Sequence, residues 1–91
     1  MHQDRLAASN IQLVAETESH YLFVRDNCIA LVERRENTIG STGMMTEQGL
    51  AYLVRRDGQA FLKSKSVEIP ADEEQVAAIR QFSQDLANAL T

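Results

Sequence analysis

Two short turn sequences, each between apolar segments, constrain the fold of this chain more than any other feature. They are Asp26-Asn27 and Asp57-Gly58. Asp, Asn and Gly tolerate the positive φ angles that two-residue hairpin turns require. The flanking segments are rich in β-branched and aromatic residues, which favour strands. The sequence therefore predicts two β-hairpins, with arms at residues 20–25 and 28–33 and at residues 49–56 and 59–65.

The predicted register leaves apolar side chains on both faces of the hairpins. A two-residue turn fixes the cross-strand partners, so Arg25 should face Cys28, and Val54 should face Phe61. One face of the first hairpin then carries Leu22, Val24, Ile29 and Leu31, and the other carries Tyr21, Phe23, Cys28, Ala30 and Val32. An antiparallel sheet with one hydrated face should instead alternate apolar and polar residues. Both faces of this sheet should therefore need to be covered by another part of the chain or by a partner.

A helix over residues 73–90 is the clearest single element of the sequence. Pro70 keeps the preceding residue extended, and Asp72 with Gln75 forms a variant of the capping box. Glu73 and Glu74 lie in the first turn, where the helix dipole favours negative charge. The apolar residues fall on one side of this helix, which predicts that this side is buried. They are Val76, Ile79, Phe82, Leu86, Ala87 and Leu90.

The remaining segments give weaker signals. Residues 1–10 are expected to be frayed, with at most one helical turn, and residues 11–16 have a moderate strand pattern. Residues 34–48 are predicted to be loop-like, with a short strand near Thr38 and Ile39. Together these elements predict a single α+β domain over residues 1–91. It consists of an antiparallel β-meander of four to five strands with one C-terminal helix packed on the sheet.

The dimensions of these elements predict self-association. Four strands of six residues make a face of about 19 by 20 Å, whereas one helix is about 10 Å wide. The helix can therefore cover roughly half of one face. We expect a homodimer through an apolar sheet face or edge, with an interface formed by Tyr21, Phe23, Tyr52, Val54 and Phe61. Alternatively, residues 1–16 fold back and complete the core of a monomer.

Charge and composition limit the possible partners. The formal net charge is −4, which disfavours binding to a phosphate backbone. Arg34-Arg35 and Arg55-Arg56 lie near aromatic residues in the sequence, but those aromatics have apolar neighbours and are expected to be buried. The sequence therefore argues against nucleic acid as a partner. No apolar run has the length of a membrane span, and the first residues do not resemble a secretion signal. The single cysteine fits a reducing cytoplasm.

The sequence offers few candidates for catalysis. Cys28 is the only thiol, and Arg25 beside it would favour a thiolate. His20 should face Glu33 at the other end of the same hairpin, too far away to act as a base on Cys28. No cysteine or histidine spacing typical of zinc is present. We therefore predict a protein that is not an enzyme and that has no cofactor and no metal site.

One further segment could bind a ligand. Gly40-Ser41-Thr42-Gly43 could form a turn whose backbone N–H groups hold an anion, and Met44-Met45 follows it. The leading hypothesis is a small cytoplasmic, non-catalytic interaction module that acts as a homodimer and works through a sheet face or the 36–48 loop. The alternative is a small-ligand-binding domain with a site near residues 40–46, between helix and sheet. In that alternative, Ser41, Thr42 and Met45 line the site.

Overall fold

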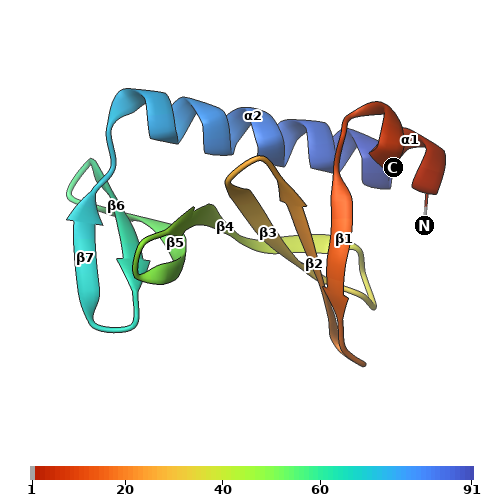
Figure 1. Cartoon of the computed structure of the whole chain (residues 1–91), viewed down its shortest axis with the longest axis horizontal. Coiled ribbons are helices and arrows are strands. Elements are labelled where there is room, and N and C mark those ends of the chain that lie inside the picture. The colour runs from red at the N-terminus through yellow and green to blue at the C-terminus, as the bar shows by residue number, and fades with distance from the viewer. Residues whose placement is uncertain (1) are drawn as a thin grey trace.

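A single seven-stranded antiparallel sheet forms one layer of the fold, and two helices on one side of it form the other (Figure 1). The computed structural model describes residues 2–91. The strands lie in the sheet in the same order as in the sequence, so each pairs with its neighbours along the chain. The elements are α1 (Gln3–Ala8), β1 (Gln12–Glu16), β2 (His20–Arg25), β3 (Cys28–Glu33), β4 (Thr38–Thr46), β5 (Gly49–Arg56), β6 (Gln59–Ser64), β7 (Val67–Pro70) and α2 (Glu73–Leu90).

The α+β architecture is confirmed, but the expected four to five strands are corrected to seven. The longest strand, β4, occupies most of the segment that was expected to be a loop. It is bonded on both sides, to β3 and to β5. Residues 38–44 pair with β3 and residues 43–46 pair with β5, and this pairing holds β4 as a strand although its side chains carry little strand signal. The short strand β7 pairs with β6 at the edge of the sheet, and residues 3–8 form α1.

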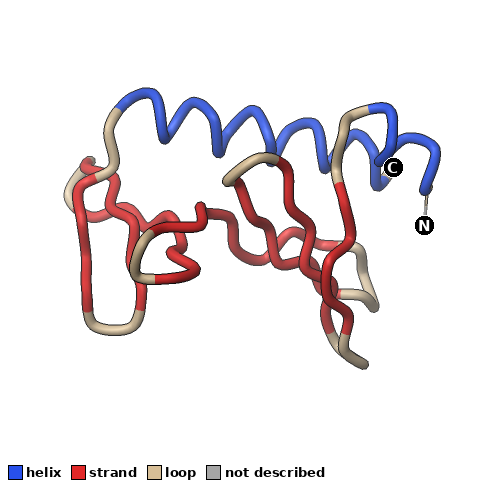
Figure 2. The backbone as a smooth tube through the Cα atoms, viewed as in Figure 1, coloured by secondary structure: helices blue, strands red, loops and turns tan. Residues whose placement is uncertain are grey.

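Both predicted hairpins form with the predicted register. Arg25 is opposite Cys28 in the β2–β3 hairpin, and Val54 is opposite Phe61 in the β5–β6 hairpin. Asp57 and Gly58 both have positive φ, at 51° and 79°, as a tight turn of this kind requires. In Figure 2 these hairpins lie in the two halves of the arched sheet, on either side of β4, and β1 and β7 form the edges of the sheet.

Helix α2 spans Glu73–Leu90 and begins with the expected capping box. The Gln75 backbone N–H donates to Asp72 Oδ1 at 2.8 Å, and the Asp72 N–H donates to Gln75 Oε1 at 3.0 Å. The helix lies along the length of the sheet (Figure 1). Its apolar side is buried against the strands, and both Phe82 and Leu86 have no exposed surface. Of the predicted stripe, Ala87 remains exposed.

The N-terminal residues complete the core on the helix side of the sheet. Leu6 of α1 and Ile11 are each 4% exposed and belong to the main core cluster. The Arg5 guanidinium donates to the Thr91 carbonyl oxygen at 2.7 Å, which ties α1 to the end of α2. Strand β1, by contrast, is exposed along its whole length at the sheet edge. This segment therefore adds to one face of the sheet and leaves the opposite face uncovered.

Candidate functional site

The sheet has an inner face, which packs against the helices, and an outer face, which points away from them. Side chains alternate between these faces along each strand. Phe23, Ala30 and Leu62 belong to the core beneath α2 and mark the inner face. The outer face carries the apolar or small residues Leu22, Val24, Ile29, Leu31, Ser41, Met45, Tyr52, Val54 and Phe61, and nearer the strand ends and the β6–β7 edge the polar residues His20, Glu33, Arg56, Lys63 and Glu68.

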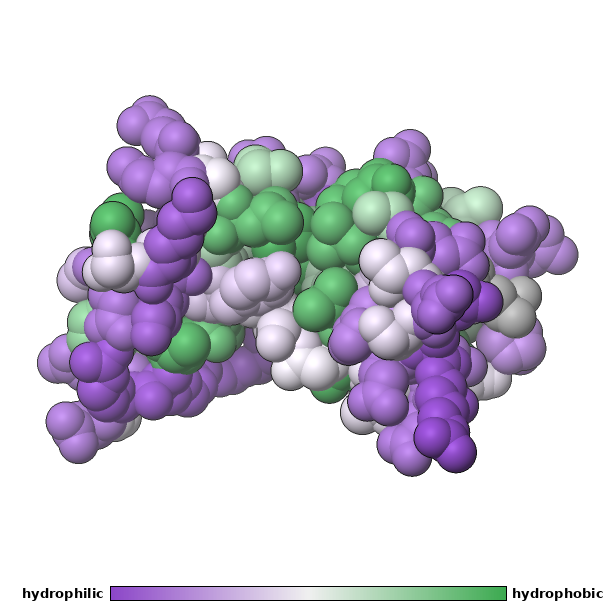
Figure 3. Space-filling model, turned by 90° about the horizontal axis from the view of Figure 1, so that it is seen from below, coloured by the Kyte–Doolittle hydropathy of each residue, from purple (hydrophilic) through white to green (hydrophobic). Residues whose placement is uncertain are grey.

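The outer face is largely apolar and is not covered by a helix. Ile29 is only 1% exposed, yet it lies outside the main core cluster. Its half-buried neighbours on the same face, including Val24 and Tyr52, therefore shield it. Met45 is 51% exposed at the end of β4. Seen from the side away from α2, apolar patches lie between two hydrophilic lobes (Figure 3).

The five predicted interface residues are divided between the two faces. Tyr52, Val54 and Phe61 lie on the outer face and are partly buried. Tyr21 and Phe23 lie on the inner face, and Phe23 is fully buried. The expectation that Phe23 lines an interface is therefore corrected, because its ring is part of the core that α2 covers. Tyr21 packs against the same core.

The proposed ligand site at residues 40–46 is not a loop, because these residues belong to β4. Alternation along this strand separates the three predicted ligand residues. Thr42 is on the inner face beside α2, whereas Ser41 and Met45 are on the outer face. They therefore cannot line one pocket together.

Cys28 is not an activated thiol. It is 6% exposed, and burial is the main influence on its pKa, which is raised above the usual 9.0. Arg25 lowers the pKa and Asp26 raises it, but both effects are smaller than that of burial. The thiol therefore stays protonated at neutral pH, and the reactive thiolate is scarce.

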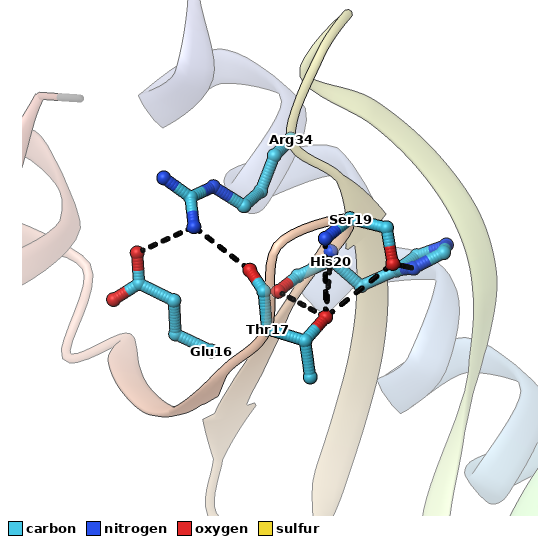
Figure 4. Close-up of polar contacts among 5 residues, drawn as sticks. All are labelled: Glu16, Thr17, Ser19, His20 and Arg34. Carbon is cyan, nitrogen blue, oxygen red and sulfur yellow. Dashed lines mark hydrogen bonds and ion pairs between the residues drawn. The ribbon is translucent and has the colours of Figure 1, made fainter.

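His20 belongs to a polar cluster around the β1–β2 turn (Figure 4). Its Nδ1 lies 2.7 Å from Ser19 Oγ, and its backbone N–H donates to Thr17 Oγ1 at 3.0 Å. Arg34 donates to the Thr17 carbonyl oxygen at 2.8 Å and forms an ion pair with Glu16 at 3.1 Å. Two of these four contacts, those of the His20 N–H and the Thr17 carbonyl oxygen, involve backbone groups of the turn. The cluster therefore accounts for the turn conformation, and it is exposed rather than enclosed in a cleft.

Arginine side chains already lie over two of the aromatic rings on which the bases of a nucleic acid would stack. Arg34 lies 5.0 Å from the centre of the Tyr21 ring. Arg56 lies 5.4 Å from that of Phe61 and forms an ion pair with Glu68. Stacking of bases on these rings would require both contacts to break.

Between α2 and the sheet runs an open groove of about 410 Å³, which the sequence did not reveal. Its walls include Arg55 and Leu53 from β5 and Arg80 and Ser83 from α2. Thr42, the one predicted ligand residue on this side, lies at the same groove. Arg55 and Arg80 also border a neighbouring depression of about 350 Å³. We call the first depression the helix–sheet groove.

Residues 2–91 contain no group of three or more His, Cys, Asp or Glu side chains that could hold a metal ion. Within the same residues, no helix combines the length and apolar character needed to cross a membrane. We compared the chain with family models, with curated proteins and with solved structures, and none of the three comparisons gave a match.

One ion pair links the first hairpin to α2. Arg25 donates to Asp85 Oδ2 at 2.9 Å and to the Ser9 carbonyl oxygen at 3.1 Å, and it lies 5.4 Å from the centre of the Phe82 ring. The pKa of Asp85 is lowered from its usual 3.8, chiefly by the hydrogen bond from Arg25 and then by that from Gln81.

This pKa shift predicts a dependence of stability on pH. The pKa of Asp85 is lower in the folded chain than in the unfolded chain. Ionised Asp85 therefore stabilises the fold, fully at pH values above its unfolded-state pKa. This stabilisation is lost as the pH falls through the folded-state pKa. We expect Asp85→Asn to be less stable than the parent chain at neutral pH, with a difference that shrinks as the pH is lowered from neutral to below the usual pKa of 3.8. Urea unfolding across this range measures it. An equal difference at both ends of the range would contradict the assignment.

Proposed function

We propose that this chain is a small, non-catalytic protein-interaction module that acts as a homodimer through the outer face of its sheet. The observation that carries the proposal is an apolar sheet face with both helices on the opposite side. Contiguous exposed apolar surface beyond a few hundred Å² is typical of interfaces. The alternative cover does not reach this face, because Leu6 and Ile11 pack on the helix side and β1 extends the sheet at its edge.

The size of the outer face suits a second copy of the chain. Seven strands at about 4.8 Å spacing and six residues at about 3.4 Å give a projected area of about 680 Å². A stable dimer buries about 800 Å² on each partner. Lys63 and Glu68, which face each other on β6 and β7, place both charge signs on the same part of the sheet. A two-fold interface can set such groups of opposite charge against each other.

The edges of the sheet offer a second way for two copies to meet. Val14 of β1 is 52% exposed, and Val67 and Ile69 of β7 are each 43% exposed. An exposed edge strand can pair with a strand of another chain. At β1, however, the register is irregular between Leu13 and Ala15, and β7 has only four residues. Both features limit a continuous ladder, so we favour the face over the edge.

The test is the molar mass in solution. We expect light scattering at tens of micromolar to give twice the 10.2 kDa of the chain. Met45→Glu places a charge on the outer face at a largely exposed position, and it should shift the mass to that of the monomer. The control is Ala78→Glu, which adds the same charge on an exposed position of α2. A parent chain that remains monomeric removes the homodimer from the proposal.

We also propose a reducing, cytoplasmic location, supported by the single buried thiol of Cys28 and the scarcity of disulfides in such compartments.

A further inference from the structure

The helix–sheet groove combines two arginines with an apolar floor. Arg55 lies on the sheet wall and Arg80 on the helix wall, and both border the groove and the depression beside it. Leu53 and Ile79 also line the groove. These four side chains come from two elements that only the packing of α2 brings together.

Among the described residues, neither arginine of the groove has an acidic partner. The side-chain ion pairs within residues 2–91 are made by Arg25, Arg34 and Arg56, and neither Arg55 nor Arg80 takes part in one. Two guanidinium groups that border the same opening without a carboxylate attract an anion. Their planar donors suit the two oxygens of a carboxylate in particular.

We propose that the helix–sheet groove binds a small amphipathic carboxylate. The carboxylate lies between Arg55 and Arg80, and an apolar chain extends along α2 over Leu53 toward Ala87. Between Arg80 and Ala87 the helix rises about 10 Å, which suits a medium-length chain. The groove volume of about 410 Å³ falls within the usual range for small-molecule sites, about 300–1,000 Å³.

Polar groups along the groove fit the same ligand. Thr42 and Ser83 line it from the sheet and from the helix, respectively. Their hydroxyls can donate to the carboxylate or keep bound water at its edge. Glu73 borders the neighbouring depression but forms no ion pair with Arg55 or Arg80. The carboxylate should therefore lie on the groove side of the two arginines.

The competing explanation is that the two arginines only cover apolar surface with their aliphatic stems. Titration calorimetry with octanoate separates the two explanations. We expect saturable binding of octanoate, and binding at least about tenfold weaker for Arg55→Gln and Arg80→Gln, the scale expected for the loss of a charged hydrogen-bond donor. Arg35→Gln is the matched control, because Arg35 lies in the β3–β4 turn, is exposed and forms no ion pair within residues 2–91.

Other probes test each part of the ligand. Octanol and octylammonium have the same chain without the negative charge, and inorganic phosphate has the charge without the chain, so each should bind at least about tenfold more weakly than octanoate. Ala87→Glu places a negative charge at the far end of the groove and should also weaken octanoate binding. The proposal is overturned if octanoate does not saturate a site, if the two arginine variants bind it as the control does, or if octanol or phosphate matches it. These results are independent of the molar mass, which tests the proposed dimer.

Discussion

Replacing Gly43 with alanine is expected to lower the free energy of unfolding by at least about 3 kcal/mol, at or beyond the upper end of the usual cost of overpacking. A Cβ atom at this position would lie 2.7 Å from Tyr52 Cα and 2.8 Å from the Ala51 carbonyl carbon, and closer still to the Ala51 carbonyl oxygen. All three atoms are backbone, so no side-chain rotation can relieve the overlap. The β4–β5 ladder would have to open where Gly43 faces Tyr52.

Gly40 provides the matched control in the same strand. A Cβ atom there would meet only the Leu31 carbonyl oxygen at 3.6 Å, an ordinary contact. We therefore expect Gly40→Ala to change the free energy of unfolding by less than about 1 kcal/mol. Urea unfolding followed by circular dichroism measures both variants, and failure of Gly43→Ala alone to fold agrees with the prediction. Equal unfolding midpoints for the two variants would show that the backbones of β4 and β5 are farther apart at Gly43 than the structure places them.

Replacing Phe82 with alanine should remove about 3–5 kcal/mol of stability, the usual range for a large aromatic in a core. The ring has no exposed surface and belongs to the core between α2 and the sheet. It also supports Arg25, whose guanidinium lies over it. Its loss therefore leaves a cavity and loosens the link from Arg25 to Asp85.

Phe82→Leu keeps part of the volume and should lose less stability, which provides a variant that stays folded for measurement. Val14→Ala is the control at a largely exposed position and should change the free energy of unfolding by about 0.5 kcal/mol or less. The measurement is the free energy of unfolding from urea titration of all three chains. A loss below about 1 kcal/mol for Phe82→Ala would place this ring outside the core.

The sequence predicted the hairpins and the long helix because local chemistry determines them. The turn residues at 26–27 and 57–58 set both registers, and these registers agree with the observed pairs. The capping pair Asp72 and Gln75 marked the start of α2. In each of these cases the decisive residues lie within a few positions of one another.

The sequence did not predict the full strand β4, because the stability of this strand does not come from its own side chains. Its glycines and hydroxyl residues resemble a loop, but hydrogen bonds from β3 and β5 fix it as a strand. Only its contact with β5 shows that Gly43 is needed for close approach. The short elements α1 and β7 also depend on the rest of the fold. Helix α1 is held by Leu6, which lies in the core, and β7 is held by its pairing with β6.

The candidate sites were only partly predictable for the same reason. The sequence indicates that both faces of the sheet are apolar, but it does not indicate which face α2 covers. For this reason the sequence-based prediction places Phe23 at an interface. Once residues 40–46 form a strand, Thr42 is separated from Ser41 and Met45. Arg55 and Arg80 are far apart in the sequence, and only the packing of α2 over β5 brings them to one groove.

The sequential order of the strands has a consequence for folding kinetics. Because every ladder joins neighbours along the chain, the entropy lost in closing each loop is small. Hairpins can therefore form early and recruit one adjacent strand at a time. The contact between Arg25 and Asp85 spans 60 residues, so docking of the C-terminal helix should be the slow, late step that makes the whole assembly cooperative.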